Sequence, residues 1–110
     1  MRYRKNVGDF GEDFAVKILI ESGYSIIERN YSTKYGEIDI IAMKDGVLHF
    51  IEVKTRTVME YGYPSEAVTE EKQRRIRRVA EGYLSRRRTR WRNVSFDVFE
   101  IMTNLITDCM

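Results

Sequence analysis

Residues 36–55 read GEIDIIAMKDGVLHFIEVKT, and this stretch decides the fold. It holds two runs rich in β-branched and aromatic residues, Glu37–Lys44 and Val47–Thr55, separated only by Asp45-Gly46. Asp-Gly between two such runs is a strong hairpin signal, because a type I′ turn needs positive φ at both central positions. The stretch therefore predicts two antiparallel strands joined by a two-residue turn.

The turn also determines which residues of the two strands oppose each other. Counting outward from it places Asp39 opposite Glu52, and Glu37 opposite Lys54. Opposed residues of an antiparallel pair project from one face with Cβ atoms roughly 4.5–5.5 Å apart, and alternate residues of a strand share a face. We therefore expect three acids and a lysine to converge on one patch of a mostly apolar surface, where unpaired charge is costly.

Two carboxylates this close repel each other unless a cation lies between them. Mg²⁺ or Mn²⁺ suits such a place, because it takes hard oxygen ligands and keeps positions for water and phosphate. Asp39 and Glu52 are the candidate ligands of a metal that polarises a phosphate and activates water. Lys54 would orient that water or stabilise phosphate charge. The alternative is a salt-bridged strand surface in which Lys54 neutralises Glu37 and Glu52.

Further elements are predicted on both sides of the hairpin, within a single domain of residues 1–110. Apolar periodicity indicates two helices, and β-branched runs indicate two more strands. The expected segments are a helix over Gly8–Ser22, a strand over Tyr24–Tyr31, a loop over Tyr61–Val68, a helix from Thr69 to about Arg87 and a strand over about Val94–Met102. The order is α-β-β-β-α-β, an α/β fold with a mixed sheet flanked by helices.

The first helix carries an acid near its apolar side. Phe10, Phe14 and Ile18 recur at four-residue spacing, and Leu19 widens this apolar stripe. Glu12 lies two turns before Leu19, at the edge of the stripe. We therefore expect Glu12 to face the core, where it would complete the metal site if this helix packs over the acidic patch.

Positive charge is concentrated in one segment of a chain whose formal net charge is only +2. Ten of the nineteen Lys and Arg residues lie between Lys72 and Arg92, with Glu81 as the single acid among them. A basic segment beside a cluster of acidic residues is suited to holding a polyanion against a metal site. The alternative is that the basic residues form a solvent-exposed helix face. The candidate phosphate-contacting residues are Lys34, Arg56, Lys72 and Arg75.

Several residue types exclude other classes of site. His49 is the single histidine, so histidine-cluster nucleases are excluded, and we expect it to be a packed residue on the opposite strand face. Cys109 is the single cysteine, which excludes an internal disulfide.

The apolar runs are too short to span a bilayer, and no signal-peptide stretch follows the basic N-terminus. We expect a cytoplasmic protein that does not enter a membrane. Trp91, within the Arg86–Arg92 cluster, either stacks on bases or packs at a helix end.

Taken together, several segments resemble the YraN family of small bacterial proteins. The resemblance covers nearly the whole chain, and the family is in turn similar to archaeal Holliday-junction resolvases and to the restriction-endonuclease-like superfamily with its PD-(D/E)xK site. The segments that carry the resemblance are Gly8-x-x-Gly11-Glu12, Glu28-Arg29-Asn30-Tyr31, Gly36-Glu37-Ile38-Asp39-Ile40-Ile41, Phe50-Ile51-Glu52-Val53-Lys54-Thr55-Arg56, the basic helix from Lys72 through Tyr83-Leu84, and Phe96-Asp97-Val98.

The resemblance implies roles for four residues. Asp39 would be the motif aspartate, Glu52 and Lys54 its E-x-K, and Glu12 a helix-borne acid of the metal site. Ile38 stands where the superfamily name has proline, and Ser95 stands where the YraN family commonly has arginine.

The implied activity is Mg²⁺- or Mn²⁺-dependent hydrolysis of DNA phosphodiester bonds by an endonuclease-like protein, with branched or junction DNA as substrate. A homodimer fits this activity, because the substrate has two strands to cut. One alternative is a non-catalytic accessory protein that binds nucleic acid and retains the nuclease fold. Another is a structural domain that partners another protein.

Overall fold

The computed structural model describes residues 7–57, 68–87 and 93–103. Within these residues the chain forms the predicted order of elements, with each bound within about two residues of the expected one. They are α1 (Val7–Glu21), β1 (Ser25–Thr33), β2 (Gly36–Lys44), β3 (Val47–Thr57), α2 (Glu70–Arg87) and β4 (Asn93–Thr103). The expected loop at Tyr61–Val68, except for Val68, and Trp91 lie outside the described residues.

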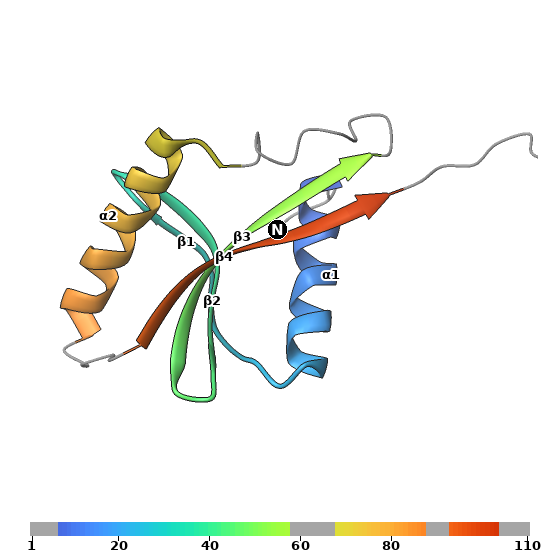
Figure 1. Cartoon of the computed structure of the whole chain (residues 1–110), viewed down its shortest axis with the longest axis horizontal. Helices are drawn as coiled ribbons and strands as arrows, with labels where there is room; N and C mark the ends of the chain where they lie inside the picture. The colour runs from blue at the N-terminus through green and yellow to red at the C-terminus, as the bar shows by residue number, and fades with distance from the viewer. Residues whose placement is uncertain (1–6, 58–67, 88–92, 104–110) are drawn as a thin grey trace, which may run out of the picture.

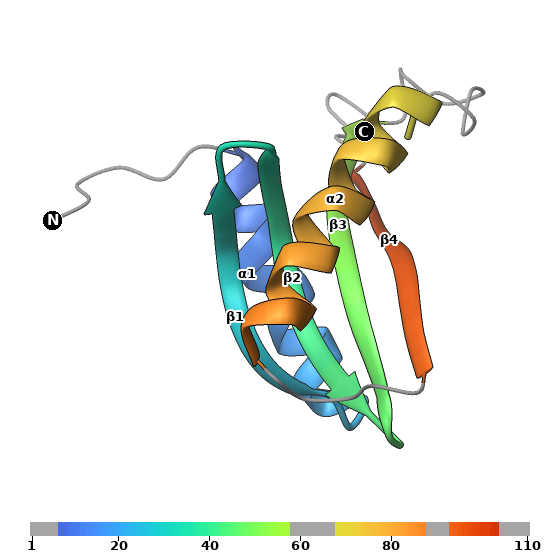
Figure 2. The same cartoon turned by 90° about the vertical axis from the view of Figure 1, so that its left-hand side faces the viewer.

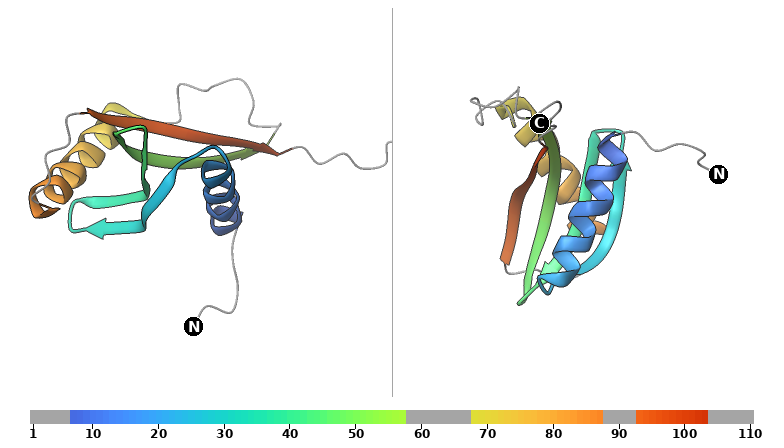
Figure 3. Two further views of the ribbon diagram at one scale, coloured as in Figure 1. Left: turned by 90° about the horizontal axis from the view of Figure 1, so that it is seen from below. Right: turned by 90° about the vertical axis from the view of Figure 1, so that its right-hand side faces the viewer.

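The strands form one mixed sheet whose spatial order is β1-β2-β3-β4. β2 pairs antiparallel with both β1 and β3, whereas β3 pairs parallel with β4. The helices cover opposite faces: α2 lies in front of the sheet and α1 behind it in Figure 2, and both views of Figure 3 show the same three layers. This is the predicted α/β architecture of a mixed sheet flanked by helices.

The turn between β2 and β3 has the predicted geometry. Asp45 and Gly46 both have positive φ, at 50° and 77°. No atom lies within 4 Å of the position where Gly46 would carry a Cβ, so its backbone conformation, rather than packing, favours glycine there. The register runs from Lys44–Val47 to Ile40–Ile51, as counted from the turn.

Each face of the sheet carries its own apolar cluster. The cluster under α2 joins the middle of the sheet to the inner side of that helix, and the cluster under α1 does the same on the other face. The α2-side cluster contains Ile38, Ile41, Leu48, Phe50, Val79, Ala80 and Tyr83, and the α1-side cluster contains Ala15, Leu19, Ile40, Ala42 and Ile51. Figure 1 shows the strongly twisted sheet standing between the two helices.

The buried side of α1 differs from the expected stripe. Phe10 and Phe14 are 63% and 51% exposed, whereas Ala15 and Leu19 are buried. Gly11 explains the difference, because a Cβ on it would lie 2.3 Å from Thr55 Oγ1 of β3. The helix approaches the strand along its small residues, which turns the two aromatic rings outward.

A membrane-spanning helix is absent from the described residues, where neither helix is both long and apolar enough to cross a bilayer.

Candidate metal centre

Asp39 lies where the pairing between β2 and β3 stops. Ile40–Ile51 is the last residue pair of the ladder. The next step would pair Asp39 with Glu52, but Asp39 Oδ2 instead accepts a hydrogen bond from the Val53 backbone N–H at 2.8 Å. A carboxylate therefore takes the place of a backbone carbonyl as the acceptor on β2. The two strands separate at this point and leave a gap.

The expected alternation of side chains along β2 also fails at Asp39. Ile38 belongs to the α2-side cluster and Ile40 to the α1-side cluster, although residues two apart normally share a face. The strand thus rotates about its own axis at Asp39. The expectation that alternate residues of β2 share a face all along the strand therefore does not hold at Asp39. The register counted from the turn is correct as far as the pair Ile40–Ile51. The regular pairing stops there, one residue short of Asp39.

The carboxyl group of Asp39 is strongly perturbed. Its pKa is raised from the ordinary value of 3.8 to about 6, chiefly by burial and to a smaller extent by the negative charges of Glu52, Glu12 and Glu37, in that order of size. The hydrogen bond from Val53 opposes them. Three carboxylates from three elements therefore act on Asp39, which is the charge distribution that a divalent cation would relieve.

Glu52 reaches α2 rather than a second carboxylate. Its Oε1 lies 2.7 Å from Lys72 Nζ, and the Glu52 side chain is only 13% exposed. Because Lys72 stands in the first turn of α2, the basic helix touches the acidic site directly. Lys72 was predicted to contact phosphate. Its pairing with Glu52 could not be predicted, because no sequence pattern between residues 52 and 72 determines how α2 lies against β3.

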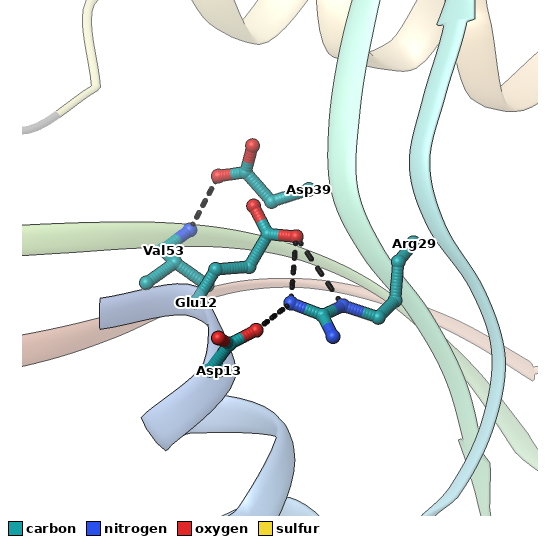
Figure 4. Close-up of polar contacts among 5 residues, drawn as sticks. All are labelled: Glu12, Asp13, Arg29, Asp39 and Val53. Carbon is teal, nitrogen blue, oxygen red and sulfur yellow. Dashed lines mark hydrogen bonds and ion pairs between the residues drawn. The ribbon is translucent and has the colours of Figure 1, made fainter. Parts of the chain in front are cut away.

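Glu12 is buried, as expected, with 8% of its surface exposed. Arg29 of β1 holds it in place: Arg29 Nη2 lies 3.2 Å from Glu12 Oε1 and 2.6 Å from Asp13 Oδ1. Figure 4 shows Glu12 and Asp39 approaching β3 at Val53 from α1 and β2, with Arg29 bound to Glu12. Sequence reasoning missed Arg29 as part of the site, although it stands in the quoted segment Glu28-Arg29-Asn30-Tyr31.

The close approach of α1 at Gly11 places Glu12 at the gap. Gly11 precedes Glu12, and its missing side chain lets the helix backbone rest against Thr55 of β3. Thr55 lies three residues beyond Glu52 on the same strand. The small residue thus brings the helix-borne acid to the strand that carries the E-x-K segment.

The remaining residues of the predicted patch divide into two groups. Lys54 is half-buried on β3, and its register partner on β4 is Glu100. It forms no ion pair with another described residue. Glu37 is exposed and accepts a hydrogen bond from Ser32 Oγ at 2.9 Å, which holds it toward β1. Lys54 therefore has no carboxylate partner among the described residues, whereas Glu37 is held toward β1.

The two carboxylates of Asp39 and Glu52 would suit a hard divalent cation that takes few protein ligands. Among the described residues, no three Asp, Glu, His or Cys side chains gather closely enough to hold a metal by themselves. Asp39 and Glu52 would supply two carboxylates at the gap. Mg²⁺ and Mn²⁺ sites in phosphate chemistry commonly use one or two carboxylates, with water and phosphate completing the shell. Participation of Glu12 requires that it share or release Arg29.

The four candidate phosphate contacts occupy different environments. Lys34 stands at the β1–β2 turn, with its Nζ 5.2 Å from the centre of the Tyr35 ring. Arg75 is exposed and pairs with Glu71 on the same helix. Arg56 is only 6% exposed and pairs with Glu100. The structure thus brings Lys72 to the acidic gap, leaves Lys34 and Arg75 at the surface, and buries Arg56.

A cavity of about 270 Å³ opens beside Glu52 between α2 and the β3–β4 half of the sheet. Its walls mix apolar rings with Glu52, Gln73 and Arg77. The Arg77 guanidinium lies 5.8 Å from the centre of the Phe96 ring, also part of the wall. The charged residues of this wall are therefore one cation, Arg77, and two acids, Glu52 and Asp97.

His49 is a packed residue, as predicted. Its Nδ1 lies 2.5 Å from Asp97 Oδ2, and Tyr24 packs edge-on against the imidazole ring. Ser95 Oγ donates to the other carboxylate oxygen of Asp97 at 2.7 Å. These contacts join β3 to β4.

The sequence of residues 11–101 matches the model of Uncharacterised protein family UPF0102. The match includes α1 from Gly11 onward, the hairpin, α2 and most of β4. The chain belongs to the UPF0102 family. This agrees with the resemblance to YraN proteins drawn from the sequence segments.

Relatives from several bacteria are identical to this UPF0102 chain at nearly half of the aligned positions. A UPF0102 protein of Dictyoglomus turgidum is 45% identical over 98 residues, covering 89% of this chain and 83% of the relative. One from Clostridium perfringens is 47% identical over 100 residues, covering 91% and 82%. One from Rhodococcus opacus is 47% identical over 102 residues, covering 93% and 86%. The match therefore extends over most of the length of each of these relatives.

Proposed function

We propose that this UPF0102 protein is a metal-dependent endonuclease that hydrolyses DNA phosphodiester bonds, with branched or junction DNA as its substrate. The observation that carries the proposal is the environment of Asp39. Its carboxylate occupies a gap in the sheet, with its pKa raised to about 6 by burial and by the charges of Glu52, Glu12 and Glu37. Perturbed acids clustered at a structural break are typical of a functional site.

Each residue of the gap has a role in this proposal. Asp39 and Glu52 hold Mg²⁺ or Mn²⁺, and Glu12 contributes from α1. The cation would polarise the scissile phosphate and lower the pKa of the attacking water. Lys54 orients that water or stabilises charge on the phosphate. Hydrolysis forms a bond between the water oxygen and phosphorus, breaks one P–O ester bond, and passes a water proton to the leaving oxygen through solvent.

Positive charge on α2 supports nucleic acid as the substrate. Lys72 pairs directly with Glu52, and Arg77 lines the adjoining cavity. A phosphate arriving at the gap can attract Lys72 away from Glu52, because both the carboxylate and the phosphate are anions that pair with an ammonium. Release of Glu52 would then free a ligand for the metal at the moment of substrate binding.

The proposal extends to assembly and location. Two strands of a branched duplex present two scissile bonds related by approximate twofold symmetry, and a symmetric homodimer places one site on each. Chromosomal DNA of bacteria lies in the cytoplasm, where we expect this protein to act. Sedimentation of the protein with and without a junction tests the dimer, and a monomer in both states would contradict it.

A second function is favoured by a specific observation. Glu52 is paired with Lys72 and Glu12 is paired with Arg29, so both carboxylates are neutralised by the protein itself. A non-catalytic accessory protein that binds nucleic acid would have this property. Under this alternative the acids of the gap hold the three layers together and bind no metal.

Cleavage assays separate the two functions. Labelled junction, flap, single-stranded and duplex DNA are incubated with Mn²⁺ and either the natural protein or Asp39→Ala. The nuclease proposal expects Mn²⁺-dependent cleavage of at least one substrate, which Asp39→Ala abolishes while DNA binding persists. A Glu37→Gln variant is the matched control, because Glu37 is an exposed acid of the same strand. A folded protein that binds DNA but cleaves none of these substrates supports the accessory function.

A further inference from the structure

A second hollow lies on the opposite side of α2 from the cavity beside Glu52. It has a volume of about 410 Å³ and lies between the end of the β1–β2 hairpin and α2. Three cations and two phenol rings are prominent in its wall, and none of its lining residues is acidic. The lining residues are Tyr31, Ser32, Thr33, Lys34, Tyr35, Arg78, Val79, Gly82 and Arg86.

The cations of this hollow have no carboxylate partner within the described part of the chain. Lys34 and Arg78 instead lie over the ring of Tyr35, at 5.2 Å and 4.3 Å from its centre. Other arginines of α2 differ, since Arg75 pairs with Glu71 and Arg87 pairs with Glu28. A site with three cations and no acid in its wall favours an anionic ligand.

Gly82 forms the floor between two of these cations. Arg78, Gly82 and Arg86 follow each other at four-residue spacing, so they lie on one side of α2. Gly82 lacks the positive φ that would require glycine, and no atom lies within 4 Å of its virtual Cβ. Glycine inside a helix costs about 0.5–1 kcal/mol relative to alanine. Neither the backbone conformation of Gly82 nor its packing requires glycine. A ligand that occupies the space beside Gly82 would explain why the residue is a glycine.

The rigid end of the hairpin holds the aromatic wall in place. Thr33 Oγ1 accepts the backbone N–H of Tyr35 at 3.1 Å, which fixes the turn that carries Lys34 and Tyr35. Tyr31 is anchored below by an edge-on contact with Tyr83, whose ring centre is 5.2 Å away. The volume lies in the range of small-ligand sites and exceeds what a phosphate alone would fill.

We propose that this hollow, between Tyr35, Gly82 and the arginines 78 and 86, binds one nucleotide unit, with its phosphate on the cations and its base against the tyrosine wall. This inference rests on one part of the proposed function, namely that the protein binds nucleic acid. The unit belongs to an unpaired strand, because a base inside a duplex has both faces covered by its neighbours. The hollow is separate from the Asp39 gap, so it acts as a second contact that holds the single-stranded part of a branched substrate.

The test measures binding without cleavage. A fluorescein-labelled oligomer of eight thymidines is titrated with each protein in EDTA, and the dissociation constant is obtained from fluorescence anisotropy. Gly82→Leu fills the floor and is expected to weaken binding about tenfold, a typical loss for one base stack. Ser85→Leu adds the same side chain at an exposed position of α2 outside the hollow, and is expected to change binding less than twofold.

A second pair of variants guards against misfolding of Gly82→Leu. Arg78→Gln with Arg86→Gln is compared with Arg74→Gln, which lies on α2 outside the hollow. Circular dichroism verifies that each variant is folded. Thymidine monophosphate is expected to compete with the labelled oligomer, and inorganic phosphate at the same concentration is expected to compete far less.

Two results would overturn the proposal. The first is unchanged oligomer binding by folded Gly82→Leu together with the double arginine variant. The second is equal competition by inorganic phosphate and the mononucleotide, which would show an anion site without a place for the base. Because EDTA removes divalent metal, failure here is distinguishable from failure of the nuclease proposal, which is decided by Mn²⁺-dependent cleavage.

Discussion

Asp39 accepts the backbone N–H of Val53 at the point where two antiparallel strands part. The amide is satisfied by a side chain, so β3 can continue beside β4, with which it is paired along its whole length, without pairing to β2. One oxygen of Asp39 is used for this bond, which leaves the other for a ligand in the gap. The same contact therefore ends the hairpin ladder and orients the acid.

The raised pKa of Asp39 predicts a pH-dependent stability gain in Asp39→Asn. The acid titrates near 3.8 when unfolded and near 6 when folded. Ionised Asp39 thus disfavours the folded state: its stabilising contribution is present below about pH 4 and is lost as pH rises through about 6. In EDTA, we expect Asp39→Asn to raise the free energy of unfolding by about 1–3 kcal/mol at pH 7.5 and by little at pH 4. Urea unfolding at both pH values measures this.

A matched variant tests whether the effect is specific. Glu37→Gln removes an exposed acid of the same strand, and its gain at pH 7.5 should be small. Equal gains for both variants would mean that general charge repulsion, rather than burial at the gap, governs the result.

Divalent metal is predicted to stabilise the folded protein through Asp39. A ligand at 100 times its dissociation constant stabilises the folded state by about 2.7 kcal/mol. We expect Mn²⁺ to raise the melting temperature of the natural protein at pH 7.5 and to have little effect on Asp39→Asn. Differential scanning calorimetry with Mn²⁺ or EDTA measures both. An equal rise in the two proteins would place the metal elsewhere.

Lys72 is predicted to compete with metal for Glu52. The two side chains form an ion pair at 2.7 Å, with Lys72 40% exposed. Such a partly exposed pair contributes about 1 kcal/mol, so Lys72→Met should bind Mn²⁺ about fivefold more tightly in isothermal titration calorimetry. Arg75→Met, which removes an exposed cation of the same helix, should bind metal as the natural protein does. Unchanged affinity in Lys72→Met would exclude Glu52 as a metal ligand.

Gly11 is predicted to be intolerant of even one added carbon. A Cβ there would lie 2.3 Å from Thr55 Oγ1, so Gly11→Ala should lower the free energy of unfolding by about 1–3 kcal/mol. Adding Thr55→Ala removes the clashing oxygen and should restore part of the loss. Gly82→Ala is the contrasting control, because open space surrounds that position and helix propensity favours alanine. Chemical denaturation compares the natural protein, the two single variants Gly11→Ala and Thr55→Ala, their double variant and Gly82→Ala. Additive effects in the double variant would argue against the clash.

The hairpin could be predicted from the sequence because its determinants are local. Asp45-Gly46 specifies the turn, and the turn sets the register as far as Ile40–Ile51. The break at Asp39 could not be predicted, since it depends on a side chain replacing a backbone acceptor across the strands. The role of Asp39 as a site residue stays a prediction, whereas its direct pairing with Glu52 in a regular ladder was wrong.

The helices show the same division between local and tertiary information. Periodicity placed α1 within one residue at each end, but its buried side follows the Gly11–Thr55 contact rather than the largest apolar residues. The partners Arg29–Glu12 and Lys72–Glu52 join residues 17 and 20 positions apart in the chain. Such pairs depend on how the layers stack, which composition and spacing do not encode.

The two-residue turn between β2 and β3 also has a consequence for insertion mutants. One extra residue there would slide β3 past β2 by a single position, and each side chain of β3 would then exchange one face of the sheet for the other. Glu52 would leave Lys72 and α2 and project toward α1. The side chains that face the gap at Asp39 are therefore determined in part by the length of the Asp45-Gly46 turn, several residues away.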